Sequence, residues 1–295
     1  MVVDEGEIHV NGHRNKRVCV AALFGTAILA GLTGCQSFPR RAPYGPLAVV
    51  WKAPESEPSH EKEVSPPVKT KARVVTRSKP ETMFHAPWRH PERPLIIDAY
   101  WDNPIDWNEL ATESRVAAII HKASEGFRAD TRYAERRAEA LRRGYLWGSY
   151  HLGVRGNPEK QADFYLQSAQ PEADEVMALD LEDLEKGMTV QEAACFIRRI
   201  YAKTGRYPLV YGNHDTIERI SEEVGETVFR QTPLWYARFR ESIPDFPEGI
   251  WSHYTLWQFS SEYKVQVRIA GTRKDIDVNV YPGTYEELRR AWPFS

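Results

Sequence analysis

The chain has 295 residues, of which 42% are hydrophobic and 27% are charged, with a formal net charge of −2. This length allows one or two domains with a sizeable core. The charge is uneven: residues 36–94 carry a net charge of +5 and residues 95–295 a net charge of −7, so the larger part of the chain lacks the basic surface that binding to nucleic acid requires.

The first 34 residues have the features of an export signal. Basic residues at positions 14, 16 and 17 precede an apolar stretch, residues 18–30, that is too short for an ordinary transmembrane helix. The stretch ends in Leu32-Thr33-Gly34-Cys35, which resembles the lipobox of bacterial lipoproteins, where the cysteine is lipidated and becomes the new N-terminus. We therefore predict a signal peptide over residues 1–34 and lipidation of Cys35. The alternative is a plain signal anchor with an incidental cysteine.

This interpretation places the mature protein in the cell envelope. In the lipoprotein pattern an Asp after the lipidated cysteine favours the inner membrane, and Gln36 stands there instead, so we expect an outer-membrane anchor facing the periplasm. Signal cleavage would remove Cys19 and lipidation would use Cys35, which leaves the thiol of Cys195 alone. We therefore expect no intramolecular disulfide.

Residues 35–93 are predicted to form a disordered linker. Residues 36–94 hold 11 of the 20 prolines, with Ser, Lys and Glu between them and little apolar periodicity. As a flexible coil, a segment of this length would span about 40–45 Å root-mean-square. The folded domain is therefore expected to begin at residue 94.

From Pro94 onward, apolar runs alternate with helical patterns, which is typical of an α/β fold. Eight strands are predicted in this part of the chain. They cover residues 95–100, 117–123, 145–152, 176–182, 208–212, 234–239, 254–260 and 276–281.

Helix signals separate the early strands. Asp130 is positioned to cap a helix that Gly144 ends, and Asn157-Pro158 fits an N-cap and first turn. Thr189 and Glu192 fit a capping box, and Gly205 fits the C-terminal stop of that helix. After residue 239 the gaps lose their helical pattern. The sequence therefore predicts five βα units followed by three strands, a TIM-like (β/α)5(β)3 barrel formed by the single domain 94–295.

One predicted strand, residues 176–182, runs directly into acidic residues. Side chains two apart on a strand share a face and lie roughly 6.5 Å apart, so Asp180 and Glu182 would project into one pocket. In α/β barrels the C-terminal ends of the strands carry the chemistry, and paired carboxylates suit acid/base cleavage of a glycosidic bond. The alternative is that these acids only cap the following loop or helix.

Other predicted strands also end in polar or aromatic residues that can reach a common pocket. Each is weak evidence by itself, because strand aromatics are usually core residues and a lone His is usually structural. The candidates are Asp98, Lys122, Glu125, Tyr150, His151, Tyr211, Trp235, Tyr236, Trp257, Gln258 and Asp277.

The order of these short motifs resembles family 25 glycoside hydrolases, the Chalaropsis-type lysozymes. The motifs cover residues 95–290 and are Ile97-Asp98-Ala99-Tyr100, Ile120-His121-Lys122-Ala123-Ser124-Glu125-Gly126, Gly148-Ser149-Tyr150-His151, Leu179-Asp180-Leu181-Glu182, Leu234-Trp235-Tyr236-Ala237, Leu256-Trp257-Gln258-Phe259 and Asp277-Val278-Asn279-Val280. The resemblance implies an N-acetylmuramidase that cleaves the β-1,4 bond between N-acetylmuramic acid and N-acetylglucosamine in peptidoglycan. One departure concerns the first motif, where Ile97 replaces the usual Gly and Trp101 follows shortly after, which affects the expected shape of the substrate subsites.

The resemblance also implies roles for the four acids. Glu182 is expected to be the general acid, with its pKa raised by burial and by neighbouring negative charge. Asp180 is expected to stay ionised, and either to act on the 2-acetamido group of the substrate or to stabilise the oxocarbenium ion. Both retention through the acetamido group and a carboxylate nucleophile remain open. Barrel closure is expected to bring Asp98 and Asp277 side by side, where they bind sugar or tune the acid.

Two other protein classes were weighed. A metal-dependent deacetylase needs an Asp-Asp and a His-x-x-x-His-like ligand set, and the sequence has no such His pair. A non-catalytic peptidoglycan-binding lipoprotein would keep the groove and lose the acid, whereas all four acids are present here. We therefore expect a monomeric hydrolase that needs no metal or organic cofactor, with glycan strands and, through its lipid, a membrane as partners.

Overall fold

The computed structural model describes residues 83–182, 184–223, 227–247, 249–273 and 276–294. The predicted signal peptide, the lipidation site at Cys35 and most of the predicted linker lie outside these residues. No helix in the described part of the chain is both long and apolar enough to cross a membrane.

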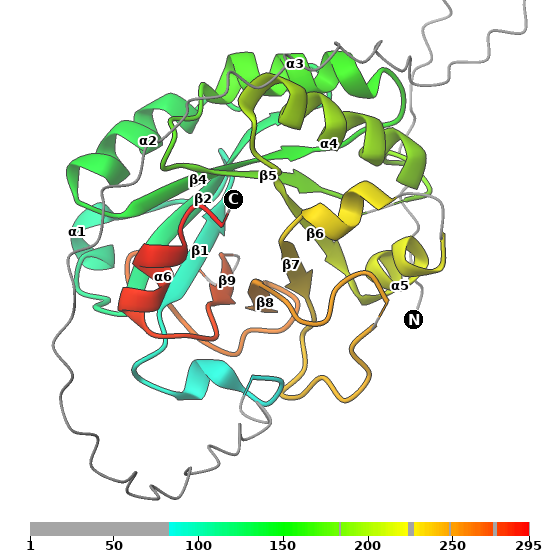
Figure 1. The fold of residues 1–295 in the computed structure, drawn as a ribbon. Helices are drawn as coiled ribbons and strands as arrows, with labels where there is room; N and C mark the ends of the chain where they lie inside the picture. Colours follow the sequence, from blue (N-terminus) through cyan, green and yellow to red (C-terminus); the bar gives the residue numbers. More distant parts are fainter. Residues whose placement is uncertain (1–82, 183, 224–226, 248, 274–275, 295) are drawn as a thin grey trace, which may run out of the picture. The chain divides into compact units, whose positions relative to one another are not determined.

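Eight strands form a closed barrel (Figure 1). In ring order the barrel strands are β1 (Leu95–Ala99), β2 (Val116–Glu125), β4 (Leu146–Leu152), β5 (Val176–Asp180), β6 (Leu209–Asn213), β7 (Leu234–Ala237), β8 (Leu256–Ser260) and β9 (Asp277–Val280). A two-residue strand, β3 (Arg128–Ala129), pairs with the end of β2. All eight predicted strands are confirmed, with ends displaced by at most two residues.

The last barrel strand runs against the other seven. Neighbouring strands from β1 to β8 are parallel, whereas β9 is antiparallel to both β8 and β1. The start of β9 therefore lies beside the carboxyl ends of the other strands. This reversal decides which end of the barrel receives the side chain of Asp277.

Five helices follow the first five βα strands, as predicted. They are α1 (Trp107–Leu110), α2 (Tyr133–Arg142), α3 (Pro158–Ala169), α4 (Val190–Thr204) and α5 (His214–Glu222). Within the described residues, β7, β8 and β9 are joined without α-helices, and a sixth helix, α6 (Tyr285–Ala291), follows β9. Short 3-10 helices occur at Pro87–Arg89 and Thr227–Gln231. The (β/α)5(β)3 architecture is confirmed.

The predicted helix signals are mostly confirmed. Thr189 and Glu192 form the reciprocal capping box of α4, and Gly205 ends that helix with φ +71°. Asn157 precedes α3 but makes no side-chain cap bond. Asp130 is not an N-cap, because α2 begins at Tyr133. Its carboxylate instead accepts hydrogen bonds from the backbone N–H groups of Trp101 and Arg132.

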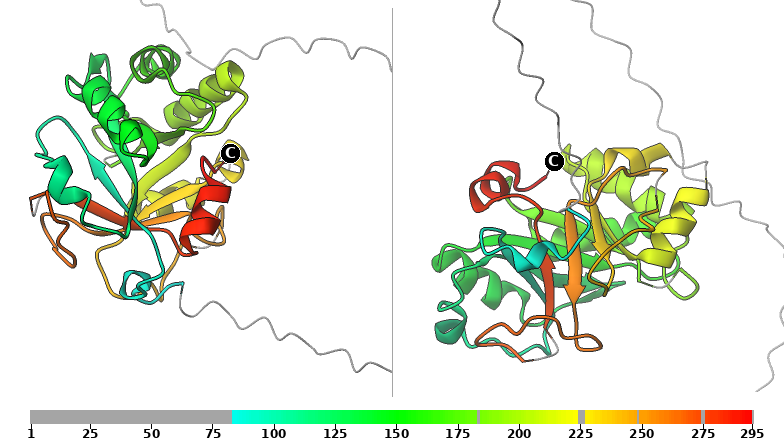
Figure 2. Two further views of the ribbon diagram at one scale, coloured as in Figure 1. Left: turned by 90° about the vertical axis from the view of Figure 1, so that its left-hand side faces the viewer. Right: turned by 90° about the horizontal axis from the view of Figure 1, so that it is seen from below.

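Successive side chains along each strand point alternately into and out of the barrel, so the core has two layers. Residues facing the barrel interior form one cluster that includes Ile96, Ile120, Ala178, Leu209 and Trp235. Outward-facing residues of the same strands pack with the helices and loops in a second, larger cluster. Leu288 and Trp292 belong to the inner cluster, so α6 closes the end of the barrel at which the parallel strands begin (Figure 2).

Residues 83–93 pack on the barrel, although the sequence assigned them to the linker. Trp88 is 5% exposed, and its ring stacks on Phe259 with 4.2 Å between centroids. His85 bridges to Ser242, and Tyr254 donates its hydroxyl to the carbonyl of Met83. The ordered domain therefore begins about a dozen residues before the predicted boundary, because an aromatic side chain in this proline-rich stretch has a partner on the barrel.

The expectation for Cys195 is wrong. This residue lies on α4 and is disulfide-bonded. The two other cysteines of the chain, Cys19 and Cys35, lie outside the described residues.

Candidate active site

The four predicted acids meet at one end of the barrel. Asp98 lies near the end of β1, Asp180 is the last residue of β5, and Glu182 follows two residues later. Asp277 is the first residue of β9, and because β9 is antiparallel its backbone pairs directly with that of Asp98. The expectation that barrel closure places Asp98 beside Asp277 is therefore confirmed.

Asp180 and Glu182 do not share a strand, in contrast to the expectation. The strand ends at Asp180, which is 6% exposed, whereas Glu182 lies in the following turn with an exposed side chain. Asn213 donates through Nδ2 to the Glu182 carbonyl (3.4 Å). The negative charge of Glu182 still raises the pKa of Asp180, so both carboxyl groups belong to one electrostatic cluster. The result is one acid at the floor of the site and one at its mouth.

Asp98 is buried and hydrogen-bonded. Its Oδ2 accepts from Nδ2 of Asn279 (2.7 Å) and from Nε2 of Gln258 (3.2 Å). Burial raises the pKa of Asp98 to about 6, and these two hydrogen bonds oppose that rise because they stabilise the carboxylate. Asp98 is therefore an acid that titrates close to neutral pH.

Among the described residues, Asp180 lacks hydrogen bonds of the kind that stabilise the carboxylate of Asp98. Its Oδ1 is buried and accepts no hydrogen bond from the described residues. Burial, followed by the charges of Glu182 and Asp98, raises the pKa of Asp180 well above its ordinary value, and Lys122 opposes the rise. Burial and the neighbouring carboxylates thus oppose the ionised state expected for Asp180, whereas Lys122 favours it.

Glu182 has a smaller rise in pKa. Partial desolvation of the Glu182 carboxyl group is the main cause of this rise. The positive charge of Lys122 lowers the pKa, and the negative charge of Glu125 raises it. Lys122 itself lies close by, with Nζ 3.1 Å from Oε2 of Glu125 and 5.0 Å from the ring centre of Tyr100. Lys122 is thus the cation that limits the proton affinity of both Asp180 and Glu182.

A cavity of about 450 Å³ opens at this end of the barrel. Inside it, Tyr211 donates its hydroxyl to Oε1 of Gln258 (2.8 Å), and Gln258 in turn donates to Asp98. The lining residues come from the loops and strand ends around the barrel mouth. They are Tyr100, Glu182, Tyr211, Asn213, Ala237, Phe239, Gln258, Ser261, Glu262, Tyr263 and Asp277.

Several predicted binding residues lie in or below this cavity. Tyr211 and Gln258 line it. Burial, and then the charges of all four acids, raise the pKa of Tyr150 and of Tyr211. Trp235 lies deeper in the barrel, where its Nε1 donates to Oδ1 of Asn279 (2.5 Å) and its ring meets those of Tyr150 and Tyr211 edge-on. These residues form the aromatic floor beneath the acids.

Three other predicted binding residues do not face the cavity. His151 is fully buried between the barrel and its helices, hydrogen-bonded to Ser124 and Gln161. Adjacent residues on a strand point to opposite sides, so a pair such as Tyr150-His151 can place only one member inside the barrel.

The same rule applies to the other two adjacent pairs. Tyr236 bonds His214 and packs on Phe246, and Trp257 packs on Trp88 and donates to the carbonyl of Arg238. His151, Tyr236 and Trp257 are therefore packing residues.

Sequence reasoning missed several residues of the site. Asn279 binds Asp98 and Trp235 at once, and it could have been found by the two-residue period, because it shares the inner face of β9 with Asp277. Tyr100 lines the cavity directly after β1. Asn213 and Tyr263 come from loops, where no periodic pattern marks the residues that turn inward.

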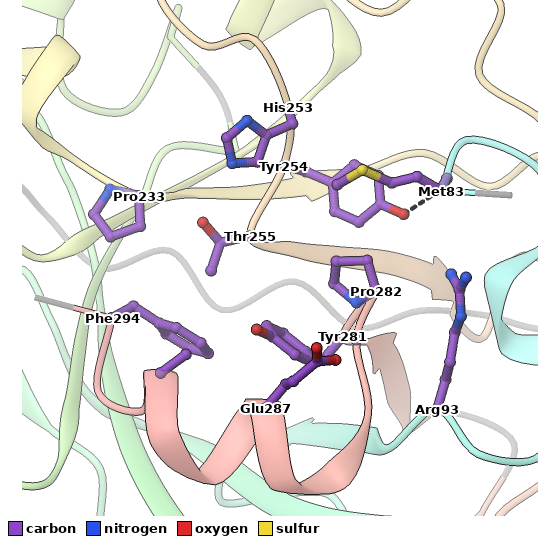
Figure 3. Close-up of a pocket in the computed structure, with 12 residues that line it drawn as sticks. Met83, Arg93, Pro233, His253, Tyr254, Thr255, Tyr281, Pro282, Glu287 and Phe294 are labelled. Carbon is purple, nitrogen blue, oxygen red and sulfur yellow. Dashed lines mark hydrogen bonds between the residues drawn. The ribbon is translucent and has the colours of Figure 1, made fainter. Parts of the chain in front are cut away.

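A larger cavity, about 550 Å³, lies at the opposite end of the barrel (Figure 3). It is bordered by Pro233 and Thr255, which precede β7 and β8, and by Tyr281, which follows β9. The one carboxylate in its lining is Glu287, whose Oε2 accepts from the backbone N–H of Thr284 (2.8 Å). This cavity is larger, but it lacks a cluster of acids that could share a proton.

Nothing in the described residues indicates a metal centre. Among them, no group of three or more His, Cys, Asp or Glu side chains has an arrangement that could hold a metal ion.

Comparison with known proteins agrees with this geometry. Residues 97–267 match the family model described as Glycosyl hydrolases family 25. The bacterial lysozyme from Streptomyces coelicolor has a similar structure, with a TM-score of 0.59 and 22% identity over 68% of this chain and 97% of that one. The N,O-diacetylmuramidase of Arthroderma benhamiae is 26% identical over 58% of this chain and 75% of its own length. The uncharacterized protein YegX of Escherichia coli K12 is 26% identical over 64% of this chain and 69% of its own length.

Proposed function

The chain belongs to glycosyl hydrolase family 25, and from this membership and its cluster of four acids we propose that it cleaves the β-1,4 bond between N-acetylmuramic acid and N-acetylglucosamine in peptidoglycan. The observation that carries the proposal is the cluster of four acids at the carboxyl ends of the parallel strands, in which Glu182 and Asp277 line the cavity while Asp98 and Asp180 are buried close to them. Glycosidases protonate a leaving oxygen, which requires a carboxylic acid that keeps its proton near neutral pH.

Glu182 is the general acid in this proposal. Its carboxyl group lies at the mouth of the cavity, where a bound glycan can reach it, and its pKa is raised. It transfers its proton to the glycosidic oxygen as the bond to the anomeric carbon breaks, and the resulting carboxylate can then activate the water that completes hydrolysis.

Asp180 acts from beneath the sugar. Its buried Oδ1 has no hydrogen-bond partner among the described residues, and in this proposal the 2-acetamido group next to the reacting carbon supplies one when substrate binds. Gln258 and Asn279 donate to Asp98, and Tyr211 holds Gln258 in place. Asp277, which pairs with Asp98, lines the cavity.

The names of the relatives support the choice of substrate. The matched proteins named as lysozyme or muramidase come from bacteria and fungi and share the fold at low sequence identity. A peptidoglycan substrate accounts for a cleft that contains aromatic walls and acids and has no basic surface.

The proposal is tested by digesting purified peptidoglycan with the wild type and with Glu182→Gln. Wild type should clear the suspension and release fragments whose reducing ends are N-acetylmuramic acid, identified by mass spectrometry after borohydride reduction. Glu218→Gln, an exposed change on α5, is the matched control and should behave as wild type. Binding without clearing by the wild type would favour the non-catalytic wall-binding alternative, and N-acetylglucosamine at the reducing ends would contradict the bond assignment.

We also propose that the protein is a lipoprotein, anchored through Cys35 in the outer membrane and facing the periplasm. The lipobox-like Leu32-Thr33-Gly34-Cys35 and the proline-rich stretch after it support this. Two or more acyl chains would give a stable anchor, whereas one chain would exchange.

Cell fractionation of wild type and Cys35→Ser tests the anchor. Wild type should partition with membranes and Cys35→Ser should not, with equal activity of the purified domain. Mass spectrometry of the mature protein decides between the anchor and an intramolecular disulfide of Cys195, because a bond to Cys35 would leave no thiol for a lipid and a bond to Cys19 would require that the signal peptide be retained. A Cys35–Cys195 disulfide in the mature protein would contradict lipidation.

A further inference from the structure

One tryptophan lies exposed beside the active-site cavity. Of the eight tryptophans in the described residues, Trp101 is the exposed one, at 50%, while six are buried and Trp107 is intermediate. Its neighbour Tyr100 lines the cavity, and the two rings meet edge-on, 6.1 Å apart and at 89°. An exposed indole that is next in sequence to a residue lining the acidic cavity is a candidate contact for a ligand that extends out of that cavity.

The backbone around Trp101 is held firmly. Arg136, which is 2% exposed, donates through Nη1 to the carbonyl of Tyr100 (2.7 Å) and through Nη2 to the carbonyls of Trp101 (3.5 Å) and Asn103. Asp130 accepts from the backbone N–H of Trp101 (2.9 Å). A buried guanidinium that binds three successive parts of one loop fixes that loop, so the exposed ring needs little further ordering when it binds a ligand.

The same loop is connected to the acids. Lys122 lies 5.0 Å from the ring centre of Tyr100 and pairs with Glu125, and its charge lowers the proton affinity of Asp180 and Glu182. Tyr100 is therefore part of the cavity wall, and the exposed ring of Trp101 contacts the ring of Tyr100. A polymer bound across the acids and leaving the cavity on this side would pass over the indole.

We propose that Trp101 is a stacking platform for a sugar of the glycan strand outside the cavity, and so makes the enzyme prefer long strands over short fragments. The proposal rests on the proposed glycan-hydrolase function. One face of a hexosamine ring carries mainly C–H groups, and this face packs on an indole by apolar burial and dispersion.

The decisive experiment measures binding and turnover separately. In a Glu182→Gln background, which binds without cleaving, the affinity for eight-sugar peptidoglycan strands is compared for Trp101, Trp101→Ala and Trp101→Phe. We expect Trp101→Ala to weaken binding about tenfold, which corresponds to about 1.4 kcal/mol. Trp101→Phe should retain most of the affinity, because it preserves an aromatic surface.

Turnover is then measured in the active protein with two substrates. Trp101→Ala should raise KM for eight-sugar strands about tenfold and leave kcat within twofold. Both constants should be unchanged for a fluorogenic aryl glycoside of the GlcNAc–MurNAc disaccharide, which is too short to reach the rim. Tyr201→Ala removes an equally exposed ring on α4 and serves as the control.

Two results would overturn the inference: equal strand binding by Trp101→Ala and its parent, or no strand binding by the parent at all. Failure of the proposed function has a different signature, namely no cleavage of either substrate by the wild type. Thermal unfolding of Trp101→Ala guards against a folding defect, which is not expected for a half-exposed side chain.

Discussion

The carboxyl groups at the two ends of the barrel differ in burial, in hydrogen bonding and in the direction in which their pKa is shifted. At the open end, Asp98 and Asp180 are buried, Asp180 has an oxygen without a partner, and burial raises the pKa of both. At the end closed by α6, Glu287 is engaged by the backbone of its own helix start, and this bond lowers its pKa. The closed end holds the larger cavity, about 550 Å³ against about 450 Å³.

The comparison shows that cavity size is a poor guide to chemistry in this fold. Both ends contain a hollow with aromatic walls, but only the open end has carboxyl groups whose charge is poorly stabilised. Such groups exchange protons near neutral pH, whereas a satisfied helix-capping carboxylate stays ionised and structural. The predictions below address this difference.

The largest effect is expected for Glu182→Gln. The substitution preserves shape and removes the transferable proton, so activity on peptidoglycan should fall by about 10² to 10⁴ while the thermal unfolding temperature stays within a few degrees of the wild-type value. Initial rates of turbidity loss and a melting curve check this. Near-normal turnover by a folded Glu182→Gln protein would show that Glu182 is not the general acid.

Asp98→Asn should stabilise the protein at neutral pH. The pKa of Asp98 is about 6 in the folded protein and 3.8 when unperturbed. Below about pH 4 the group is protonated in both states and carries no penalty. Between about pH 4 and pH 6 the unfolded chain releases this proton while the folded protein still holds it, so stability falls as the pH rises, by an amount on the order of 3 kcal/mol that is complete above pH 6.

Denaturant unfolding of wild type and Asp98→Asn from pH 4 to pH 8 checks this sign. The two proteins should have similar stability at pH 4, and Asp98→Asn should be the more stable at pH 8. A wild type that gains stability relative to Asp98→Asn with rising pH would show that the hydrogen bonds from Asn279 and Gln258 outweigh burial.

Two tyrosine variants test whether catalysis depends on residues that face the barrel interior and not on those that face outward. Tyr211→Phe removes the hydroxyl that holds Gln258 against Asp98, and we expect kcat to fall about fivefold, the effect of one hydrogen bond. Tyr236→Phe removes a hydroxyl that bonds His214 on the outer face and should leave kcat within twofold. Equal losses in the two variants would contradict the division into inner and outer faces.

The smallest effect is expected at the closed end. Glu287→Gln weakens the capping box of α6, so thermal stability should decrease slightly while kcat and KM on peptidoglycan remain unchanged. A melting curve and steady-state kinetics check both statements. A marked loss of activity would mean that the larger cavity takes part in catalysis.

The architecture could be predicted because its signals are local. Apolar runs bounded by turns gave all eight barrel strands, and the capping box at Thr189 and Glu192 with Gly205 gave α4 almost to the residue. Asp98, Asp180, Glu182 and Asp277 follow from motif order, and the structure brings them to one end.

The errors have a common physical origin in long-range packing. Tyr236 and His151 were chosen for residue type, yet the side of the strand on which each lies is fixed by its partners across the barrel. The sequence also does not show that Oδ1 of Asp180 is buried without a donor among the described residues. Trp88 seemed to belong to a linker, because its stacking partner Phe259 is far away in the sequence.

The first described residue, Met83, borders the cavity at the closed end, across the barrel from the acids (Figure 3). Whatever precedes it in the chain therefore joins the domain on the side away from the catalytic mouth. A glycan strand is far longer than the cavity and must lie across that mouth with both ends extending beyond it. Because Met83 lies on the far side, the point at which the chain enters the described domain is not in the path of such a strand.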